Sequence, residues 1–362
     1  MNNRYSSLDG LRSFAAIGIV IMHIHANMSI KPDDNFFYAT MIPSLSNLIC
    51  VFFVISAFAM CCGYYEKIKG GQISMNKFYS KRYRRLLPFF ALMVLIDCLV
   101  PHGANKYELS TMVNNDTVIH PWLEQLYNSF ANLTLTFNLL PNPDIKVIGV
   151  GWFLGVVFLF YMLFPFFIFM MDNKRRAWIS MSIVFIYCYI AIEYFFTDIF
   201  IDFKSHKNII YFAPFFGVGG IIYLYRETIS SFVKKYNYVV LVLAWLMTVG
   251  YWLYPASGFF FVVEMCALCA IWLIYAIGTE GNILNNRFTK YLSGISMEVY
   301  LCHMMAFRGV DMLHLSRIIT QPDLLYWLTC ILTLGGAIIF SHIVKYKVLP
   351  LVEPYIFKQN TK

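Results

Sequence analysis

Ten long apolar runs, separated by short polar segments, constrain this chain more than any other feature of its sequence. A helix needs roughly 20 residues to cross the hydrocarbon core of a bilayer, and most of these runs approach or exceed that length. They do not alternate apolar and polar residues, as the strands of a membrane barrel would. We therefore expect a bundle of about ten transmembrane helices. The runs lie near residues 13–30, 43–63, 86–100, 148–171, 178–197, 208–225, 237–254, 258–279, 291–313 and 324–349.

The composition agrees with a membrane protein and leaves little chain for anything else. Of the 362 residues, 59% are hydrophobic and 13% are charged, whereas soluble domains average about 45–50% apolar and about 25% charged residues. The segments between the spans are too short for a second globular domain. The expected architecture is a single all-α integral membrane bundle over residues 1–362, without a separate soluble domain.

The distribution of positive charge predicts how the bundle is oriented. When the segments between apolar runs are taken alternately, one set carries 21 Lys and Arg residues and the other carries 6. Cytoplasmic loops are enriched in Lys and Arg, so we expect both termini in the cytoplasm. The net charge of +8 is not gathered on a polar domain, which argues against a nucleic-acid partner. The expected partner of the surface is the lipid bilayer.

The first apolar run carries the most informative polar pair, Arg12 and His23. Eleven residues are close to three turns of an α-helix, so the two share one face about 16 Å apart along the axis. His23 then lies near mid-membrane, where an ionisable group usually faces the protein interior or a water-filled cavity. A neutral imidazole there can accept a proton from a hydroxyl group. A structural histidine held by hydrogen bonds is the alternative. His25 is expected to face nearly the opposite way.

A basic segment, Lys81–Arg85, directly precedes the third run. Arg82 and Arg85 are one helical turn apart, so their guanidinium groups can converge on one polyanion. Paired guanidinium donors suit phosphate oxygens. A topology anchor that contacts anionic lipid headgroups is an equally good interpretation of this segment by itself.

The sequence lacks several common catalytic and metal-binding motifs. It contains no P-loop, no HExxH zinc motif and no serine-nucleophile motif. Cys266 and Cys269 form a CxxC pair inside an apolar run, where cysteine usually serves as a small packing residue. Glu264, deep in the same run, suits a functional site and a structural hydrogen bond equally. We expect no metal site and no permanently bound cofactor.

Four short blocks of sequence are informative when they are taken together. They read SLDGLR over Ser7–Arg12 followed by His23, VFFVISAF over Val51–Phe58, RYRR over Arg82–Arg85 and YLSGISMEVYLCH over Tyr291–His303. In this order they resemble the membrane-bound acyltransferase-3 family. Its members share an R-x10-H pair, an FFVISGF segment, an RxxR segment and a late YLGxISxxxYLxH stretch, and alanine replaces the glycine of the second segment here.

One further block departs from the common family pattern. Trp152–Tyr161 reads WFLGVVFLFY, where many members have WSLxxExxFY, and it resembles the WFL form of another branch. Val157 therefore occupies the position of a glutamate. The departure leaves open both the role of a carboxylate at this position and the identity of the acceptor.

The resemblance implies an enzyme that transfers an acyl group, most often acetyl, from cytoplasmic acyl-CoA to an extracytoplasmic hydroxyl. The acceptor is commonly a sugar of a cell-envelope polysaccharide or glycolipid, which places the protein in a bacterial inner membrane. Arg82, Arg85 and Arg12 are implied to bind the acyl-CoA co-substrate, with His23 as the general base beyond Arg12. An acyl-His23 intermediate is the mechanistic alternative. The secondary candidates are Trp152, Tyr161, Tyr300 and His303 by motif position, together with Glu264.

A transporter or flippase of a glycan or glycolipid is the rival hypothesis. Such a protein would equally need many spans and polar groups at mid-membrane. A flippase has no use for a CoA site at the cytoplasmic face, so the combination of the R-x10-H pair with the RxxR segment favours the enzyme. The acceptor, the acyl chain and the oligomeric state are left open by the sequence.

Overall fold

The computed structural model describes residues 5–99, 126, 129–135, 149–195, 208–279 and 283–356. Within these ranges the secondary structure is helical and no strand occurs, so the all-α class is confirmed. The long helices are α1 (Ser7–Asn27), α3 (Leu48–Lys69), α4 (Met75–Leu99), α6 (Trp152–Met170), α7 (Lys174–Ile190), α8 (Ile209–Leu224), α9 (Arg226–Leu253), α10 (Gly258–Gly278), α11 (Arg287–Asp311) and α12 (Pro322–Ile343).

Short helical segments extend or connect these helices. They include three π-helical segments, which continue the chain before α3, after α7 and after α12. Their bounds are η1 (Phe37–Met41), α2 (Ile42–Ser44), η2 (Leu45–Asn47), η5 (Gly149–Gly151), η6 (Ala191–Phe195), η8 (Leu315–Arg317), η9 (Val344–Val348) and α13 (Leu349–Ile356).

Each of the ten apolar runs falls on one of the long helices, and the protein is an integral multi-pass membrane protein. Helix α8 is apolar but short for a span, while α4 and α11 carry charged side chains that lower their hydropathy. The total of ten spans and the cytoplasmic termini remain predictions. Seven helical segments in the described part are long and apolar enough to cross a membrane alone: Ser7–Asn27, Phe37–Lys69, Gly149–Met170, Lys174–Tyr194, Arg226–Leu253, Gly258–Gly278 and Pro322–Val352.

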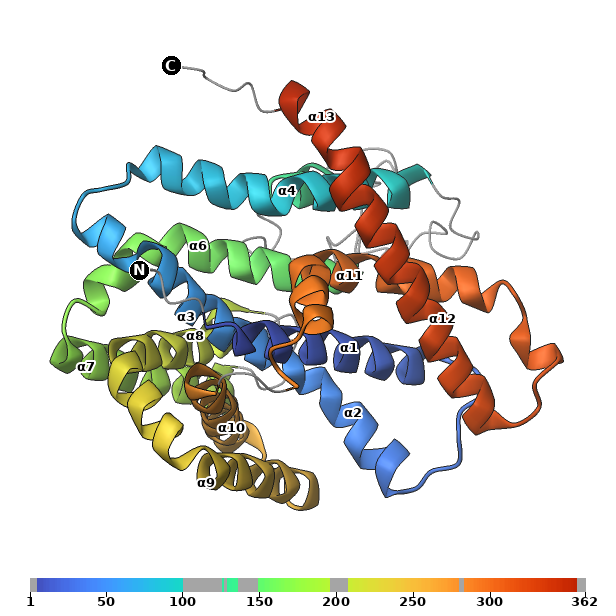
Figure 1. Ribbon diagram of the computed structural model, residues 1–362, viewed down its shortest axis with the longest axis horizontal. Helices are drawn as coiled ribbons and strands as arrows, with labels where there is room; N and C mark the ends of the chain where they lie inside the picture. The colour runs from blue at the N-terminus through green and yellow to red at the C-terminus, as the bar shows by residue number, and fades with distance from the viewer. Residues whose placement is uncertain are drawn as a thin grey trace, which may run out of the picture.

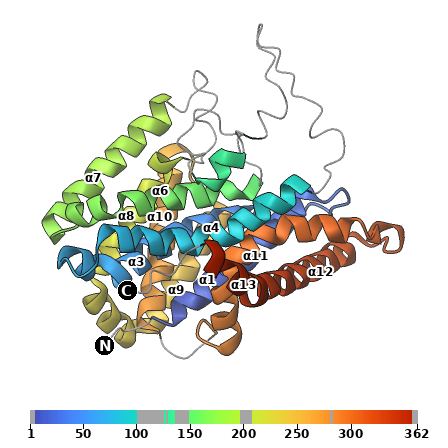
Figure 2. The same ribbon diagram turned by 90° about the horizontal axis from the view of Figure 1, so that it is seen from above.

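Helix α1 occupies the middle of the bundle (Figure 1). It packs against α11 and α12 on one side and against α3 and α10 on the other. The remaining helices form outer layers, because α8 covers α3, α7 covers α8, and α9 covers α10. In the view from above, α7 extends away from the other helices at one edge (Figure 2).

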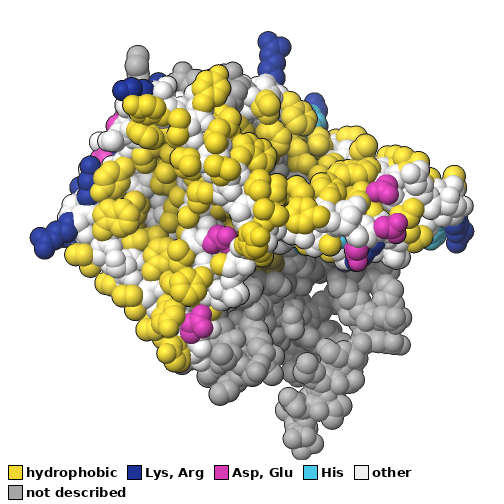
Figure 3. Space-filling model, turned by 90° about the horizontal axis from the view of Figure 1, so that it is seen from below, with side chains coloured by type: hydrophobic (Ala, Val, Ile, Leu, Met, Phe, Trp, Pro, Cys, Tyr) yellow, Lys and Arg dark blue, Asp and Glu magenta, His cyan; other side chains and the backbone are white. Residues whose placement is uncertain are grey.

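Large apolar side chains cover much of the outer surface, as a lipid-facing protein requires. Figure 3 shows one face on which hydrophobic side chains form a continuous layer and most charged side chains lie toward the edges. Exposed members include Ile183 on α7, Leu246 on α9 and Ile331 on α12. In water, an apolar patch of this extent would drive association.

Small and polar residues allow α1 to approach its neighbours closely. A Cβ atom on Gly10 would overlap backbone atoms of Leu284. The Ser13 hydroxyl donates to the Thr289 carbonyl at 2.8 Å. Such close packing and interhelical hydrogen bonds are what hold helices together in a bilayer. Because Ser13 meets Thr289 near the start of α11, and His23 meets His303 further along, α1 and α11 run in the same direction.

Candidate functional site

A cavity of about 190 Å³, which we call the basic cavity, lies among α1, α3, α4, α6 and α11. Three arginines line it: Arg12 from α1, and Arg82 and Arg85 from the first half of α4. Within the described part of the chain no Asp or Glu side chain lines it. The three guanidinium groups and the missing carboxylates make this a cavity suited to a polyanion.

Aromatic side chains hold Arg82 inside the protein. Its Nη2 donates to the Tyr64 hydroxyl at 2.6 Å, and its guanidinium carbon lies 4.5 Å from the Tyr64 ring centroid and 5.6 Å from that of Tyr161. A guanidinium group over aromatic faces is held in place by the cation–π attraction. A topology anchor would instead extend toward lipid headgroups, so the position of Arg82 favours a binding role.

Arg85 and Arg12, the other two arginines of the basic cavity, differ in how exposed they are. Arg85 is exposed and therefore lies at the mouth of the cavity. Arg12 is half-buried, and its Nη1 lies 3.9 Å from Asp9 Oδ1. The same oxygen accepts a hydrogen bond from the Ser293 hydroxyl at 2.8 Å. Asp9 thus orients Arg12 and links α1 to the cavity-lining face of α11.

His23 and His303 form a pair of imidazole rings further along α1 and α11, with their centroids 5.1 Å apart. His303 is fully buried, and its Nδ1 lies 2.6 Å from the Tyr300 carbonyl oxygen. A carbonyl only accepts, so Nδ1 carries a proton, and in the neutral imidazole Nε2 then has the lone pair. That Nε2 is buried and has no hydrogen-bond partner in the described part of the chain. His23 is half-buried and faces protein rather than only lipid.

Tyr300 lies between the basic cavity and the two histidines. Its side chain lines the cavity, and its ring centroid is 5.8 Å from that of His303. Its hydroxyl donates to the Val150 carbonyl at 3.0 Å. Neither histidine lines the cavity itself. Tyr300 is therefore a residue of the cavity lining that also contacts the histidine pair.

Of the other candidate residues predicted from the sequence, some line the basic cavity and some lie elsewhere. Tyr161 lines the basic cavity, and so does Val157 at the position of the family's glutamate. Trp152 is not among the lining residues and stacks on Phe212, with 5.6 Å between centroids. Glu264 lies elsewhere, where its Oε2 accepts from the Ala256 amide at 2.9 Å, which favours the structural alternative for this residue.

The orientation predicted for His25 agrees with the structure. Its ring stacks on Tyr38, at 6.0 Å and 8° between planes, and meets the Tyr326 ring edge-on at 5.7 Å. Sequence reasoning missed Tyr64 and Asp9. The spacing of Asp9 three residues before Arg12 is a signal that could have found the second. Nothing in the sequence links Tyr64 to Arg82, because the two belong to different helices.

Fold and site together define a multi-pass helical membrane protein with an arginine-lined cavity and an imidazole pair formed by half-buried His23 and buried His303. In the described ranges no group of three or more His, Cys, Asp or Glu side chains is placed to hold a metal ion. A family model described as an acyltransferase domain matches residues 5–342. The chain therefore belongs to the acyltransferase-3 family, as its motifs indicate. No curated protein and no solved structure matches it in the other two comparisons.

Proposed function

We propose that this protein transfers an acyl group, acetyl in the simplest case, from cytoplasmic acyl-CoA to a hydroxyl of an extracytoplasmic sugar or cell-envelope polysaccharide. The cell membrane concerned is the bacterial inner membrane. Family membership supplies the acyl transfer. One observation supports the finer statement: an arginine-lined cavity and an imidazole pair lie at successive positions along the same two packed helices, α1 and α11.

The basic cavity is the proposed site for the donor. CoA carries several phosphate charges, and guanidinium groups pair with phosphate oxygens through two parallel hydrogen bonds. Arg85 at the mouth and Arg82 within would hold the phosphates, while Arg12 would contact the pantetheine arm as it extends along α1. The lining carries no carboxylate in the described part of the chain, which favours binding of the CoA phosphates. Val157 contributes to this lining because it stands where many family members have a glutamate.

His23 is the proposed general base. It accepts the proton of the acceptor hydroxyl as that oxygen attacks the thioester carbonyl carbon, and a C–O bond forms. The C–S bond then breaks, and the CoA thiolate leaves and takes up the proton from His23. His303, held by the Tyr300 carbonyl, positions His23 through ring contact. An acyl-His23 intermediate would differ in that His23 Nδ1 or Nε2 attacks the thioester first.

The donor proposal is tested by calorimetry of CoA binding to the purified protein in detergent. Arg82→Ala with Arg85→Ala removes two charge-assisted contacts, worth about 1.5–3 kcal/mol each, so the dissociation constant should rise about 100-fold or more. Lys81→Ala with Arg84→Ala is the matched control, because it removes two charges from the same turn of α4 but none from the cavity lining. If both double variants raised the dissociation constant for CoA equally, Arg82 and Arg85 would be topology anchors only.

The chemistry is tested with labelled acetyl-CoA and extracted envelope glycans. His23→Gln should lower ester-linked label about 10²- to 10⁴-fold without changing CoA affinity. His25→Gln, two residues along the same helix but facing Tyr38, should retain most of the transfer. Near-normal transfer by a well-folded His23→Gln protein would reject the general base. Movement of glycan across vesicle membranes without any labelling would instead support the flippase.

A further inference from the structure

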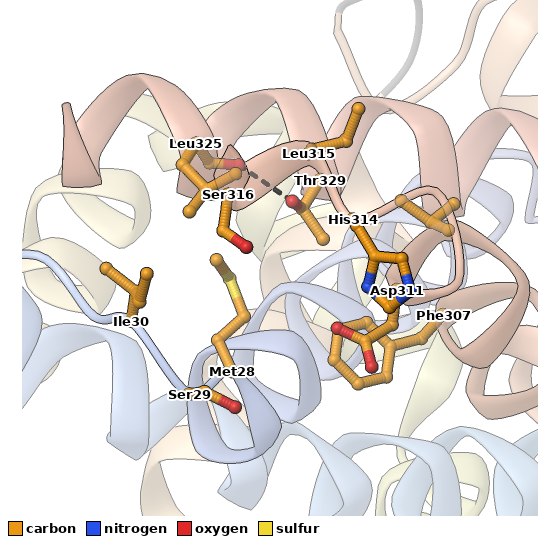
Figure 4. A pocket seen from close by; sticks show the side chains of 11 residues that line it. Met28, Ser29, Ile30, Phe307, Asp311, His314, Leu315, Ser316, Leu325 and Thr329 are labelled. Carbon is orange, nitrogen blue, oxygen red and sulfur yellow. Dashed lines mark hydrogen bonds between the residues drawn. The ribbon is translucent and has the colours of Figure 1, made fainter. Parts of the chain in front are cut away.

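A second pocket, of about 100 Å³, opens at the other end of the α1–α11 pair. Figure 4 shows its side chains converging from the chain after α1, from the end of α11 and from α12. We call it the distal pocket. The lining residues used below include Met28, Ser29, Phe307, Asp311, His314 and Ser316.

The distal pocket lies along the same line as the site already described. On α11, Ser293 and Ser296 line the basic cavity, His303 contacts His23, and Phe307 begins the distal pocket one helical turn later. One turn is about 5.4 Å along the axis. The imidazole pair therefore lies between two pockets, and the distal one approaches it from the side opposite the arginines.

The two pockets differ in charge. Three arginines line the basic cavity, whereas in the described part of the chain neither Lys nor Arg lines the distal pocket. Its polar side-chain groups are the Asp311 carboxylate, the His314 imidazole and the hydroxyls of Ser29, Ser316 and Thr329, the last of which donates to the Leu325 carbonyl at 2.7 Å. A site with this lining disfavours polyanions and offers acceptors and donors to a neutral, hydroxyl-bearing molecule.

Asp311 and His314 are the groups most suited to orient such a molecule. Asp311 at the end of α11 and His314 in the turn that follows both line the pocket (Figure 4). A carboxylate accepts hydrogen bonds from two neighbouring hydroxyls, which is a common arrangement on a sugar ring. His314 has a left-handed backbone, with φ of 50°, which is uncommon for a residue other than glycine. The Phe307 ring and the Met28 side chain supply an apolar surface for the C–H face of the ring.

We propose that the distal pocket is an acceptor subsite that binds one neutral sugar ring through Asp311 and His314. The inference rests on the proposed acyl transfer and adds the place from which the acceptor reaches His23. Phe307, at the inner end of the pocket, is one helical turn, about 5.4 Å, beyond His303, so a hydroxyl of the ring that reaches Phe307 can face the imidazole pair. The thioester and the acceptor then approach His23 from opposite ends of α1.

The test uses methyl glycosides of glucose, galactose and N-acetylglucosamine as probes, with labelled acetyl-CoA and the full-length protein in detergent. Asp311→Asn and His314→Gln should each raise KM for the glycoside about 10-fold or more, as the loss of a charge-assisted hydrogen bond predicts. CoA affinity should be unchanged. Asp33→Asn is the matched control, because Asp33 is an exposed carboxylate in the same region after α1 and does not line the pocket.

The outcomes separate this inference from the proposed function. Transfer by the wild-type protein with unchanged glycoside KM in both variants overturns the subsite and leaves the acyltransferase intact. Glycoside binding that depends on Asp311 without any transfer supports the subsite and rejects the enzyme. A wild-type protein that neither binds nor acetylates any of the three probes overturns the assignment to a neutral sugar ring.

Discussion

Helices α1 and α9 are equally apolar, but the protein surrounds them to very different extents. In the most apolar stretch of each helix, 67% of the residues are buried in α1 and 17% in α9. Helix α1 contacts α3, α10, α11 and α12, whereas α9 packs mainly on α10 and lies at the edge of the bundle (Figure 1). Hydropathy thus identifies a span but does not tell a central helix from a peripheral one.

The residues that distinguish the two helices are small or polar rather than apolar. In a bilayer, lipid is as apolar as a leucine side chain, so helices associate through close contact and hydrogen bonds. On α1, Gly10 meets the backbone of Leu284, and Ser13 bonds to Thr289. The groups proposed for catalysis, Arg12 and His23, are on this same helix. The site is built where the surrounding helices can fix side chains on all sides.

The largest expected difference between the α1 and α9 regions is in the free energy of unfolding that is lost when an ion pair is broken. On α11, which packs against α1, Glu298 Oε1 lies 2.6 Å from Lys345 Nζ of η9, and Lys345 also donates to the Gly294 carbonyl. Glu298 is only 4% exposed. Lys345→Met leaves this carboxylate buried and unpaired, which should lower the free energy of unfolding by about 3–5 kcal/mol.

The comparison on α9 is the pair of half-buried Arg226 and exposed Glu227, in which Arg226 Nε lies 3.4 Å from Glu227 Oε1. Glu227→Gln should cost about 0–1 kcal/mol, because solvent screens such a pair. Denaturant unfolding in detergent measures both changes. Adding Glu298→Gln to Lys345→Met should recover part of the loss. Equal losses for the two single variants would contradict the contrast between the regions.

Most of the fold could be predicted because the apolar runs are long. The ten expected ranges match ten helices, but helix ends do not coincide with the ends of the runs. Helix α9 begins at Arg226, eleven residues before the expected start at 237, and its backbone is non-helical at Tyr236 (φ −124°, ψ 32°). The polar first part of α9 is held by local hydrogen bonds, which hydropathy does not detect.

The candidate site was predictable where it depends on one helix and not where it depends on two. The register of Arg12 with His23, and that of Arg82 with Arg85, follows from 3.6 residues per turn. The contact of His23 with His303 joins residues that are 280 positions apart in the sequence. The distal pocket likewise forms from the ends of three helices. Neither arrangement leaves a periodic pattern in one segment, so only the motif resemblance indicated His303.

The second prediction compares apolar side chains. Ile24 on α1 is fully buried, whereas Leu246 on α9 is 62% exposed. Ile24→Ala opens a cavity among packed side chains and should cost about 2–5 kcal/mol. Leu246→Ala exchanges one lipid-facing apolar group for a smaller one and should leave the unfolding free energy nearly unchanged, as measured by the same denaturant titration. A loss from Leu246→Ala as large as that from Ile24→Ala would show that α9 is covered by another chain.

The third prediction has the smallest expected effect and compares two glycines. It tests the close approach of helix backbones rather than the burial of side chains. A methyl group at Gly10 would overlap the backbone of Leu284, which has no rotamer with which to move aside, whereas one at Gly250 on α9 meets no atom within 4 Å. Gly10→Ala should cost about 1–3 kcal/mol through overpacking, and Gly250→Ala should gain roughly 0.5–1 kcal/mol through helix propensity.

Thermal unfolding in detergent measures the direction of both changes. Gly10→Ala should also lower acetyl transfer, because moving α1 away from residue 284 shifts Arg12 and His23 against α11. A Gly10→Ala protein with unchanged thermal stability and full acetyl transfer would show that α1 tolerates displacement. Its central position would then carry no functional constraint, and the distinction between α1 and α9 would reduce to lipid exposure alone.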